Sequence, residues 1–174
     1  GHNWLVALAA APGEARWGLA ACDVTTGELE LQLVAADALA GEWARLAPRE
    51  LLISESGEAP PALPADARLT RRASRQFGID GARGRLCARL GVASLDGFGL
   101  EGLDAAVGAA GALVAYLEES WPQALANLRP PRAVRADATR KPSRPIERRT
   151  RSATSSSSSI TSTSGPSVVS AMLT

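Results

Sequence analysis

Four carboxylates stand where strands or turns are expected to end, and together they could bind metal ions for phosphodiester cleavage. They are Asp23, Glu28, Glu55 and Asp80. Hydrolysis of this kind requires several carboxylates that converge on two ions. Solvated acids usually occupy the same positions, because a carboxylate is rarely buried without a partner. The pattern therefore leaves a metal-dependent nuclease as one hypothesis and ordinary surface acids as the other, and it favours the second.

A second group of residues could bind a partner rather than cleave a substrate. Arg83, Arg85 and Arg89 lie off the apolar stripe of a predicted helix, and Gly84 leaves a bare patch of backbone beside them. We interpret these four residues as a candidate face for an acidic or hydrogen-bonding partner. A helix face that contacts only water explains the same residues equally well.

Several classes of enzyme are excluded by the residues that are missing. The only lysine, Lys141, precedes a proline, so the sequence contains no P-loop. The only histidine is His2, which leaves Ser–His and Cys–His catalysis without a base. No CxxC, HExxH or EF-hand pattern occurs. We therefore expect no catalytic residue, no cofactor and no metal site in this chain, and we expect Cys22 and Cys87 to be reduced thiols.

Charge divides the sequence into an acidic body and a basic tail. Residues 1–139 contain 13 Arg and 17 Asp or Glu, whereas residues 140–174 contain 6 Lys or Arg and 1 Glu. An acidic body is poorly suited to bind the phosphates of a duplex. The tail is rich in Ser and Thr and cannot build a core, so we predict that it is disordered. Its basic cluster leaves nucleic-acid binding through the tail as a further hypothesis.

No segment is apolar over the 18 residues that a membrane span needs, since the longest candidate, 107–117, is too short. The sequence begins without Met and shows no signal peptide. We therefore expect a cytoplasmic protein without a membrane partner, and we interpret the chain as a piece of a longer one or as one that carries a short scar at its start.

The hydrophobic pattern predicts strands followed by strand–helix units, which is typical of an α/β fold with a mixed sheet. Three short strands joined by tight turns are expected to form an antiparallel meander at 4–10, 17–23 and 29–35. The strand at 29–35 alternates in polarity, which predicts burial on one face only. The later elements are predicted as a helix capped by Asp37 and ending at Leu46, a strand at 50–54, a loop at 57–66, a strand or basic loop at 69–77, a helix capped by Asp80 and ending at Leu90, and a last strand or exit path at 132–136.

The segment Ser94–Glu119 combines a glycine turn with a helix rich in Ala and Gly. Asp96, Gly97, Phe98 and Gly99 form the predicted turn, which should carry Phe98 inward. The helix has an apolar stripe from Leu103 to Leu117 and small residues on its opposite side. Glycine costs about 1 kcal/mol in a helix, which is tolerable where another element must approach closely. We predict a central helix that is buried on two sides.

Four segments resemble the connector domain, domain II, of the MutS family of DNA mismatch repair proteins. The segments are "WGLAACDVTTGELEL", "IDGARGRLCARLGVASLDGFGLEG", "AAGALVAYLEE" and "LRPPRAVRAD". The resemblance implies an RNase H-like α/β fold, with a mixed sheet flanked by helices. In RNase H-like nucleases the first strand supplies a metal-binding Asp, whereas the first strand here reads "WLVALAA" and Asp23 ends the second. The resemblance therefore implies the fold without the active site.

The resemblance also implies a role. The connector links mismatch recognition to the ATPase of the parent protein and offers a docking surface for a MutL homologue. Its other partners are the remaining MutS domains, the MutS dimer partner and, through the full-length protein, mismatched DNA. ATP and Mg belong to the full-length family protein, and this domain is expected to bind neither.

The resemblance covers residues 3–137, and we predict one connector-like domain at 1–137 with a separate tail at 138–174. After "RADAT" the family should continue into helices, whereas this chain reads "RKPSRPIERRTRS" and then a Ser/Thr tract. The abrupt change in composition suggests a shifted reading frame or a mispredicted C-terminus.

Overall fold

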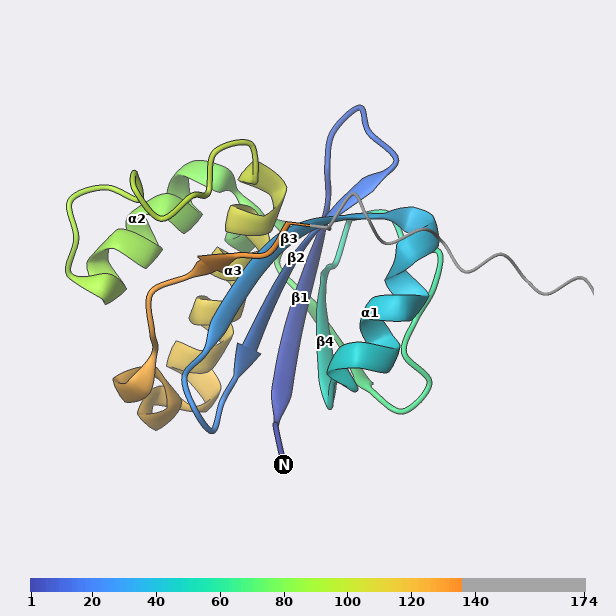
Figure 1. Cartoon of the computed structure of the whole chain (residues 1–174), viewed down its shortest axis with the longest axis horizontal. Coiled ribbons are helices and arrows are strands. Elements are labelled where there is room, and N and C mark those ends of the chain that lie inside the picture. The colour runs from blue at the N-terminus through green and yellow to red at the C-terminus, as the bar shows by residue number, and fades with distance from the viewer. Residues whose placement is uncertain (136–174) are drawn as a thin grey trace, which may run out of the picture. The chain divides into compact units, whose positions relative to one another are not determined.

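Six strands build one mixed sheet in the computed structural model, which describes residues 1–135 (Figure 1). The strands are β1 (Trp4–Ala10), β2 (Arg16–Asp23), β3 (Leu29–Ala35), β4 (Glu50–Ser54), β5 (Arg68–Arg72) and β6 (Arg132–Ala133). Their order in the sheet is β5-β4-β1-β2-β3-β6. β2 runs antiparallel to both neighbours, and the remaining pairs are parallel. The predicted meander of the first three strands is thus confirmed, and the predicted tail at 138–174 lies outside the described residues.

The short apolar runs bounded by turn residues predicted the positions of the first four strands to within one residue. β1, β3 and β4 have the predicted bounds, and β2 begins one residue earlier than predicted. The ambiguous segment 69–77 forms all but the first residue of β5 and then a 3-10 turn, η2 (Ser74–Phe77). The exit path forms the two-residue strand β6, which pairs with β3.

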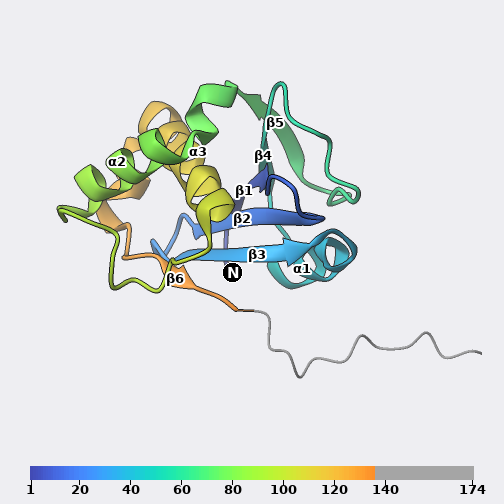
Figure 2. The same ribbon diagram turned by 90° about the horizontal axis from the view of Figure 1, so that it is seen from above.

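Helices cover both faces of the sheet (Figure 2). α1 (Leu39–Leu46) lies on one face, while α2 (Ile79–Leu90) and α3 (Asp104–Ser120) lie on the other. Two further 3-10 turns are η1 (Ala36–Ala38) and η3 (Pro122–Asn127). No helix within residues 1–135 has the length and apolar character needed to cross a membrane.

Both predicted aspartate caps were wrong. Asp37 lies inside η1, so the chain is already helical before the predicted cap, and Ala38 stands at the N-cap of α1. Gly78 is the N-cap of α2, and Asp80 lies within the first turn. A carboxylate there still interacts favourably with the positive end of the helix dipole.

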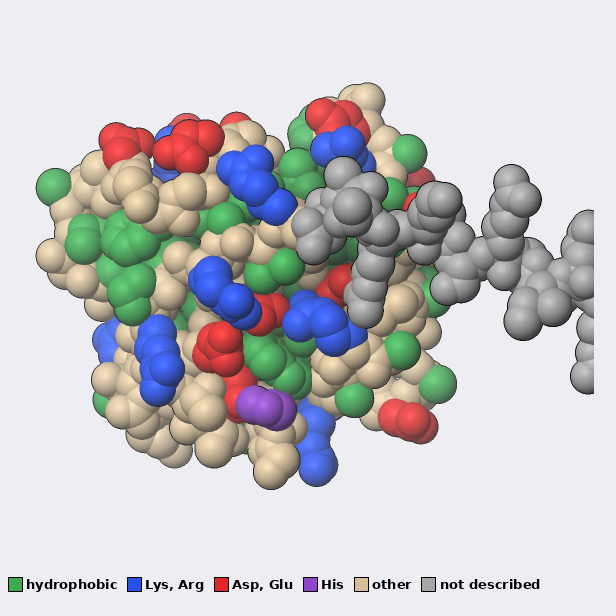
Figure 3. Space-filling model, viewed as in Figure 1, with side chains coloured by type: hydrophobic (Ala, Val, Ile, Leu, Met, Phe, Trp, Pro, Cys, Tyr) green, Lys and Arg blue, Asp and Glu red, His purple; other side chains and the backbone are tan. Residues whose placement is uncertain are grey.

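The prediction that β3 is buried on one face only was also wrong. Glu30 and Gln32 are just 4% and 3% exposed, because α1 and the side chain of Arg132 cover them. Glu30 binds Arg45 of α1 at 3.0 Å and Arg132 of β6, while the Gln32 amide donates to Glu42 at 2.7 Å. Basic and acidic side chains accordingly alternate over this side of the molecule (Figure 3). Burial of these polar groups is tolerated because each has a partner.

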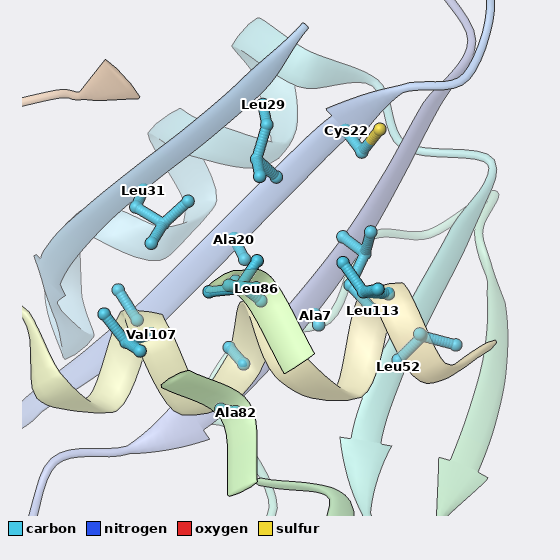
Figure 4. Close-up of a cluster of buried hydrophobic side chains, with 14 of the residues drawn as sticks. Ala7, Ala20, Cys22, Leu29, Leu31, Leu52, Ala82, Leu86, Val107 and Leu113 are labelled. Atoms are coloured by element: carbon cyan, nitrogen blue, oxygen red, sulfur yellow. The ribbon is translucent and has the colours of Figure 1, made fainter. Parts of the chain in front are cut away.

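α3 is the centre of the larger hydrophobic core. Every residue from Ala105 to Ala115 is buried, and so is Leu117. Val107 and Leu113 lie between sheet residues such as Leu31 and Leu52, and Ala82 and Leu86 of α2 complete the cluster (Figure 4). The predicted burial of this helix on two sides is confirmed.

Glycines allow the layers around α3 to approach closely. An ideal Cβ on Gly18 of β2 would lie 2.1 Å from the carbonyl carbon of Ala105. A Cβ on Gly108 would lie 2.4 Å from the carbonyl oxygen of Phe77, and a Cβ on Gly111 would lie 2.3 Å from the Cβ of Ala82. These separations leave no room for a methyl group. The helix glycines therefore serve the close approach that the sequence predicted.

We predict opposite effects on stability for two glycine substitutions. Gly111→Ala should lower the free energy of unfolding by about 1–3 kcal/mol, because overpacking against Ala82 outweighs the gain in helix propensity. Gly84→Ala in α2 should raise the free energy of unfolding by up to about 1 kcal/mol, because no atom of residues 1–135 outside the helix itself lies within 4 Å of the added carbon. Urea unfolding of both variants measures the difference. Equal stabilisation by the two would contradict the close packing of α2 on α3.

Candidate functional site

The predicted partner face lies on α2, whose inner side packs on α3. Ala82 and Leu86 are fully buried there, while Ile79 is 37% exposed and Leu90 is half-buried. Of these four apolar residues at helical spacing, only Ala82 and Leu86 form the fully buried side of the helix. Most of the remaining surface of α2 faces solvent.

Two of the three arginines of this face contact α3. The Arg83 guanidinium lies 2.6 Å from the carboxylate of Asp104, in a pair with both side chains about half exposed. Arg85 donates to the carbonyl oxygen of Gly111 at 3.2 Å, and its Nε lies 3.9 Å from Glu118. Arg85 therefore helps to hold α2 on α3. The exposed pair of Arg83 contributes at most about 1 kcal/mol.

Arg89 and Gly84 are the residues of the face that are most accessible to a partner. Arg89 is exposed and forms no ion pair with any residue of the described part of the chain. Gly84 is exposed, as are Gly81 and Ala88, which lie on the same side of the helix. Sequence reasoning missed this small-residue strip, although its spacing of three and four residues could have indicated it.

The glycine turn leads the chain from α2 into α3. Gly97 and Gly99 have φ angles of 89° and 72°, which residues with a Cβ rarely adopt. The amide of Asp96 donates to the Ser94 hydroxyl at 3.0 Å. Phe98 is half-buried against the core, whereas Leu100 and Leu103 are each only 6% exposed. The turn thus positions the start of α3 mainly through these two leucines.

Asp23 is the most enclosed of the candidate metal ligands, and protein groups already occupy its carboxylate. Its side chain is 0% exposed, and it accepts hydrogen bonds from the His2 ring at 2.7 Å, the Asn3 amide at 3.2 Å and the Thr25 amide at 3.0 Å. Burial alone would raise the pKa of Asp23. The hydrogen bonds outweigh burial and lower the pKa to about 2. Asp23 therefore fixes the β2–β3 hairpin to the start of β1.

The other candidate acids do not join Asp23. Glu28 pairs with Arg132 at 3.3 Å, and Glu55 and Asp80 are exposed elsewhere. No group of three His, Cys, Asp or Glu side chains within residues 1–135 is arranged to hold a metal ion. The geometry of the described residues thus gives no support to the nuclease hypothesis.

Comparison with known proteins identifies the family. Residues 3–129 match the family described as MutS domain II. This chain belongs to that family. The DNA mismatch repair protein MutS of Parasynechococcus marenigrum (strain WH8102) is 40% identical over 126 residues, which cover 70% of this chain and 14% of that relative. This MutS domain II chain thus spans about one seventh of the length of the curated relative it matches.

Sequence reasoning missed a polar cluster of this MutS domain II that joins β5 to α3. The Tyr116 hydroxyl donates to the Glu50 carboxylate at 2.9 and 3.0 Å, and the Thr70 hydroxyl donates to the same carboxylate. The Arg72 guanidinium lies 5.4 Å from the centre of the Tyr116 ring and also binds Glu119. Residues 20 to 66 positions apart form these contacts, so no local pattern could have indicated them.

The two thiols of the MutS domain II are free, as predicted, and one of them is strongly buried. Cys22 lies in the core, where burial and the neighbouring charge of Asp23 raise its pKa to about 12. Cys87 is half-buried. Only a thiolate reacts readily, so Cys22 should be chemically inert at neutral pH.

We predict that Asp23→Asn lowers the free energy of unfolding by about 1–3 kcal/mol at pH 7, because the charge-assisted bonds of the carboxylate to the His2 ring and to two backbone amides would become weaker neutral ones. The folded-state pKa of Asp23 is depressed, so its contribution is complete above pH 3.8 and disappears as the pH falls towards 2. The difference between wild type and variant should therefore shrink across this range. Urea unfolding at pH 7, 4 and 2.5 measures it. A difference that does not change with pH would contradict this role.

Proposed function

We propose that this MutS domain II is a non-catalytic connector of a DNA mismatch repair protein. It would link the mismatch-recognition and ATPase parts of the parent protein and would offer a docking surface for a MutL homologue. The family match over residues 3–129 carries the proposal, because these residues include every helix and the first five strands of the fold.

We further assign the sheet to the RNase H-like class, with residues 1–137 as the domain. The strand order β5-β4-β1-β2-β3, in which only β2 is antiparallel, supports this assignment. The first strand contains no acid, and Asp23 is bonded to the hairpin and to His2. These observations support an RNase H-like frame without catalysis.

The packing around α3 supports the role of a rigid connector. Gly18, Gly108 and Gly111 bring the sheet, η2 and α2 into direct backbone contact with this helix. Protein interiors packed in this way transmit strain instead of absorbing it. A displacement applied at one side of the domain would therefore be carried to the other side. On this proposal ATP, Mg and mismatched DNA are bound by other parts of the full-length protein and of its dimer partner.

We propose the exposed part of α2 as the docking face, consisting of Gly84, Arg89 and the guanidinium of Arg83. Arg85 supports the face from behind through its bond to Gly111. A bare helix surface beside a positive charge that has no acidic partner within residues 1–135 suits a partner that brings an acidic group close to the helix.

Calorimetric titration of the full 174-residue chain with a purified MutL homologue tests the docking face. Arg89→Glu should weaken binding at least about fivefold at low salt and less at high salt, because an exposed charge acts through a screened field. Arg16→Glu, an exposed arginine on the β1–β2 hairpin, is the matched control and should bind as wild type does.

The possible outcomes separate the docking face from the family role. Wild-type affinity in Arg89→Glu would remove this face as a docking surface and leave the connector proposal intact. An absence of heat with the wild-type chain would contradict docking through this domain alone.

A further inference from the structure

β5 is the last strand on one side of the sheet and leaves an open edge (Figure 2). It pairs only with β4 among the described residues. The Arg68 amide donates to the carbonyl of Arg49 at 2.9 Å, and the carbonyl of Arg72 accepts from the amide of Glu55 at 2.9 Å. In a parallel ladder the residues alternate between the two sides of the strand. The backbone groups of Leu69 and Arg71 therefore point away from the sheet, and no backbone group within residues 1–135 pairs with them.

The side chains of Leu69 and Arg71 both lie on the α1 side of the sheet. The register aligns them with Leu51 and Ile53, which belong to the core on that side. Leu69 is 42% exposed, and Arg71 is exposed with no acidic partner in the described residues. The edge thus presents an apolar side chain and a free positive charge two residues apart.

The arginines on the opposite side of β5 are already occupied. Arg68 lies 3.9 Å from Glu50, and Arg72 binds Glu119 and covers Tyr116. The contacts of Arg68 and Thr70 with Glu50 hold β5 to β4, and those of Arg72 hold it to α3. The edge is therefore fixed in an extended conformation before any partner arrives, which lowers the entropic cost of binding.

The charge of this edge selects what can pair with it. Open edges are commonly protected by charged residues, by proline or by bulges. β5 contains no proline, but three of its five residues are arginine. Like charges on facing strands are destabilising, so a second copy of the same edge is repelled. An extended segment that carries carboxylates meets no such repulsion.

We propose that the open edge of β5 binds an extended acidic segment of a partner protein by strand addition. Backbone groups of the segment pair with those of Leu69 and Arg71. An apolar residue of the segment lies beside Leu69, and a carboxylate two residues away lies beside Arg71. This mode takes its affinity from main-chain hydrogen bonds and its specificity from alternate side chains. The surface is separate from the α2 face and does not depend on the function proposed above.

Fluorescence anisotropy with a labelled peptide, TVTETVT, tests the proposal on the full chain. Its apolar–x–acid spacing reads the same in both directions, so either strand direction can form. The matched peptide TVTKTVT replaces the carboxylate with an ammonium group. Wild type should bind the acidic peptide at least about tenfold more tightly than the basic one, since close charge pairs of opposite and like sign differ by this much or more.

Charge exchange distinguishes the edge from the rest of the basic surface. Arg71→Glu should weaken binding of the acidic peptide at least about tenfold and should gain affinity for the basic peptide. Arg75→Glu, which changes an exposed arginine just beyond β5, should leave the affinity within about twofold. Equal binding by wild type and Arg71→Glu, or an absence of binding by wild type, would overturn the proposal.

Backbone pairing has its own test. Leu69→Pro removes one outward amide without removing a bond to β4, and proline is tolerated at such edge positions. Leu69→Ala shortens the side chain and keeps the amide, so Leu69→Pro should bind more weakly than Leu69→Ala. In the wild-type chain, the amides of Leu69 and Arg71 should exchange more slowly with solvent when the acidic peptide is bound. Unchanged exchange at both amides would overturn strand addition even if the peptide binds.

Discussion

The close contact of α3 with both the sheet and α2 is the constraint on which the rest of this domain depends. A helix that is buried over eleven successive residues must present small side chains to at least one neighbour. Gly108 and Gly111 meet this condition on the helix, and Gly18 of β2 meets the same need on the sheet. Since interiors are packed at crystal-like density, none of these contacts can loosen alone without opening a void in the larger core.

Polar side chains add links beyond the hydrophobic cores, and these links reach the edge strands β5 and β6. Glu30 links β3 to α1 and β6 through two arginines, and Glu50 links β4 to β5 and α3 through Thr70 and Tyr116. Each of these carboxylates is largely enclosed but fully bonded. Removal of one partner would leave an enclosed carboxylate oxygen less well bonded, which costs more than the bond itself contributes. The two clusters therefore fix the edges of the sheet in register with its centre.

Features of this fold that depend on neighbouring residues could be predicted from the sequence, whereas features that depend on residues far apart in the chain could not. Strands such as β1 and β4 could be located because a short apolar run between turns is a local signal. The burial of α3 and the need for its glycines could be predicted for the same reason. The burial of the second face of β3 could not be predicted, because α1 and β6 cover this face. β6 lies about a hundred residues further along the chain. Similarly, the helical pattern of α2 could not indicate that Arg85 turns back onto Gly111 of α3.

The first strand, β1, and the last strand, β6, are held in the sheet to unequal degrees. β1 lies between β2 and β4 and is paired on both sides over most of its length. β6 contains two residues, pairs with β3 alone and is reinforced by the bonds of Arg132 to Glu28 and Glu30. A mechanical pull on Trp4 would have to shear two ladders at once, whereas a pull on Ala133 would load a single short one. Under tension between these two residues, β6 should detach from β3 first. The other five strands should stay paired when β6 detaches.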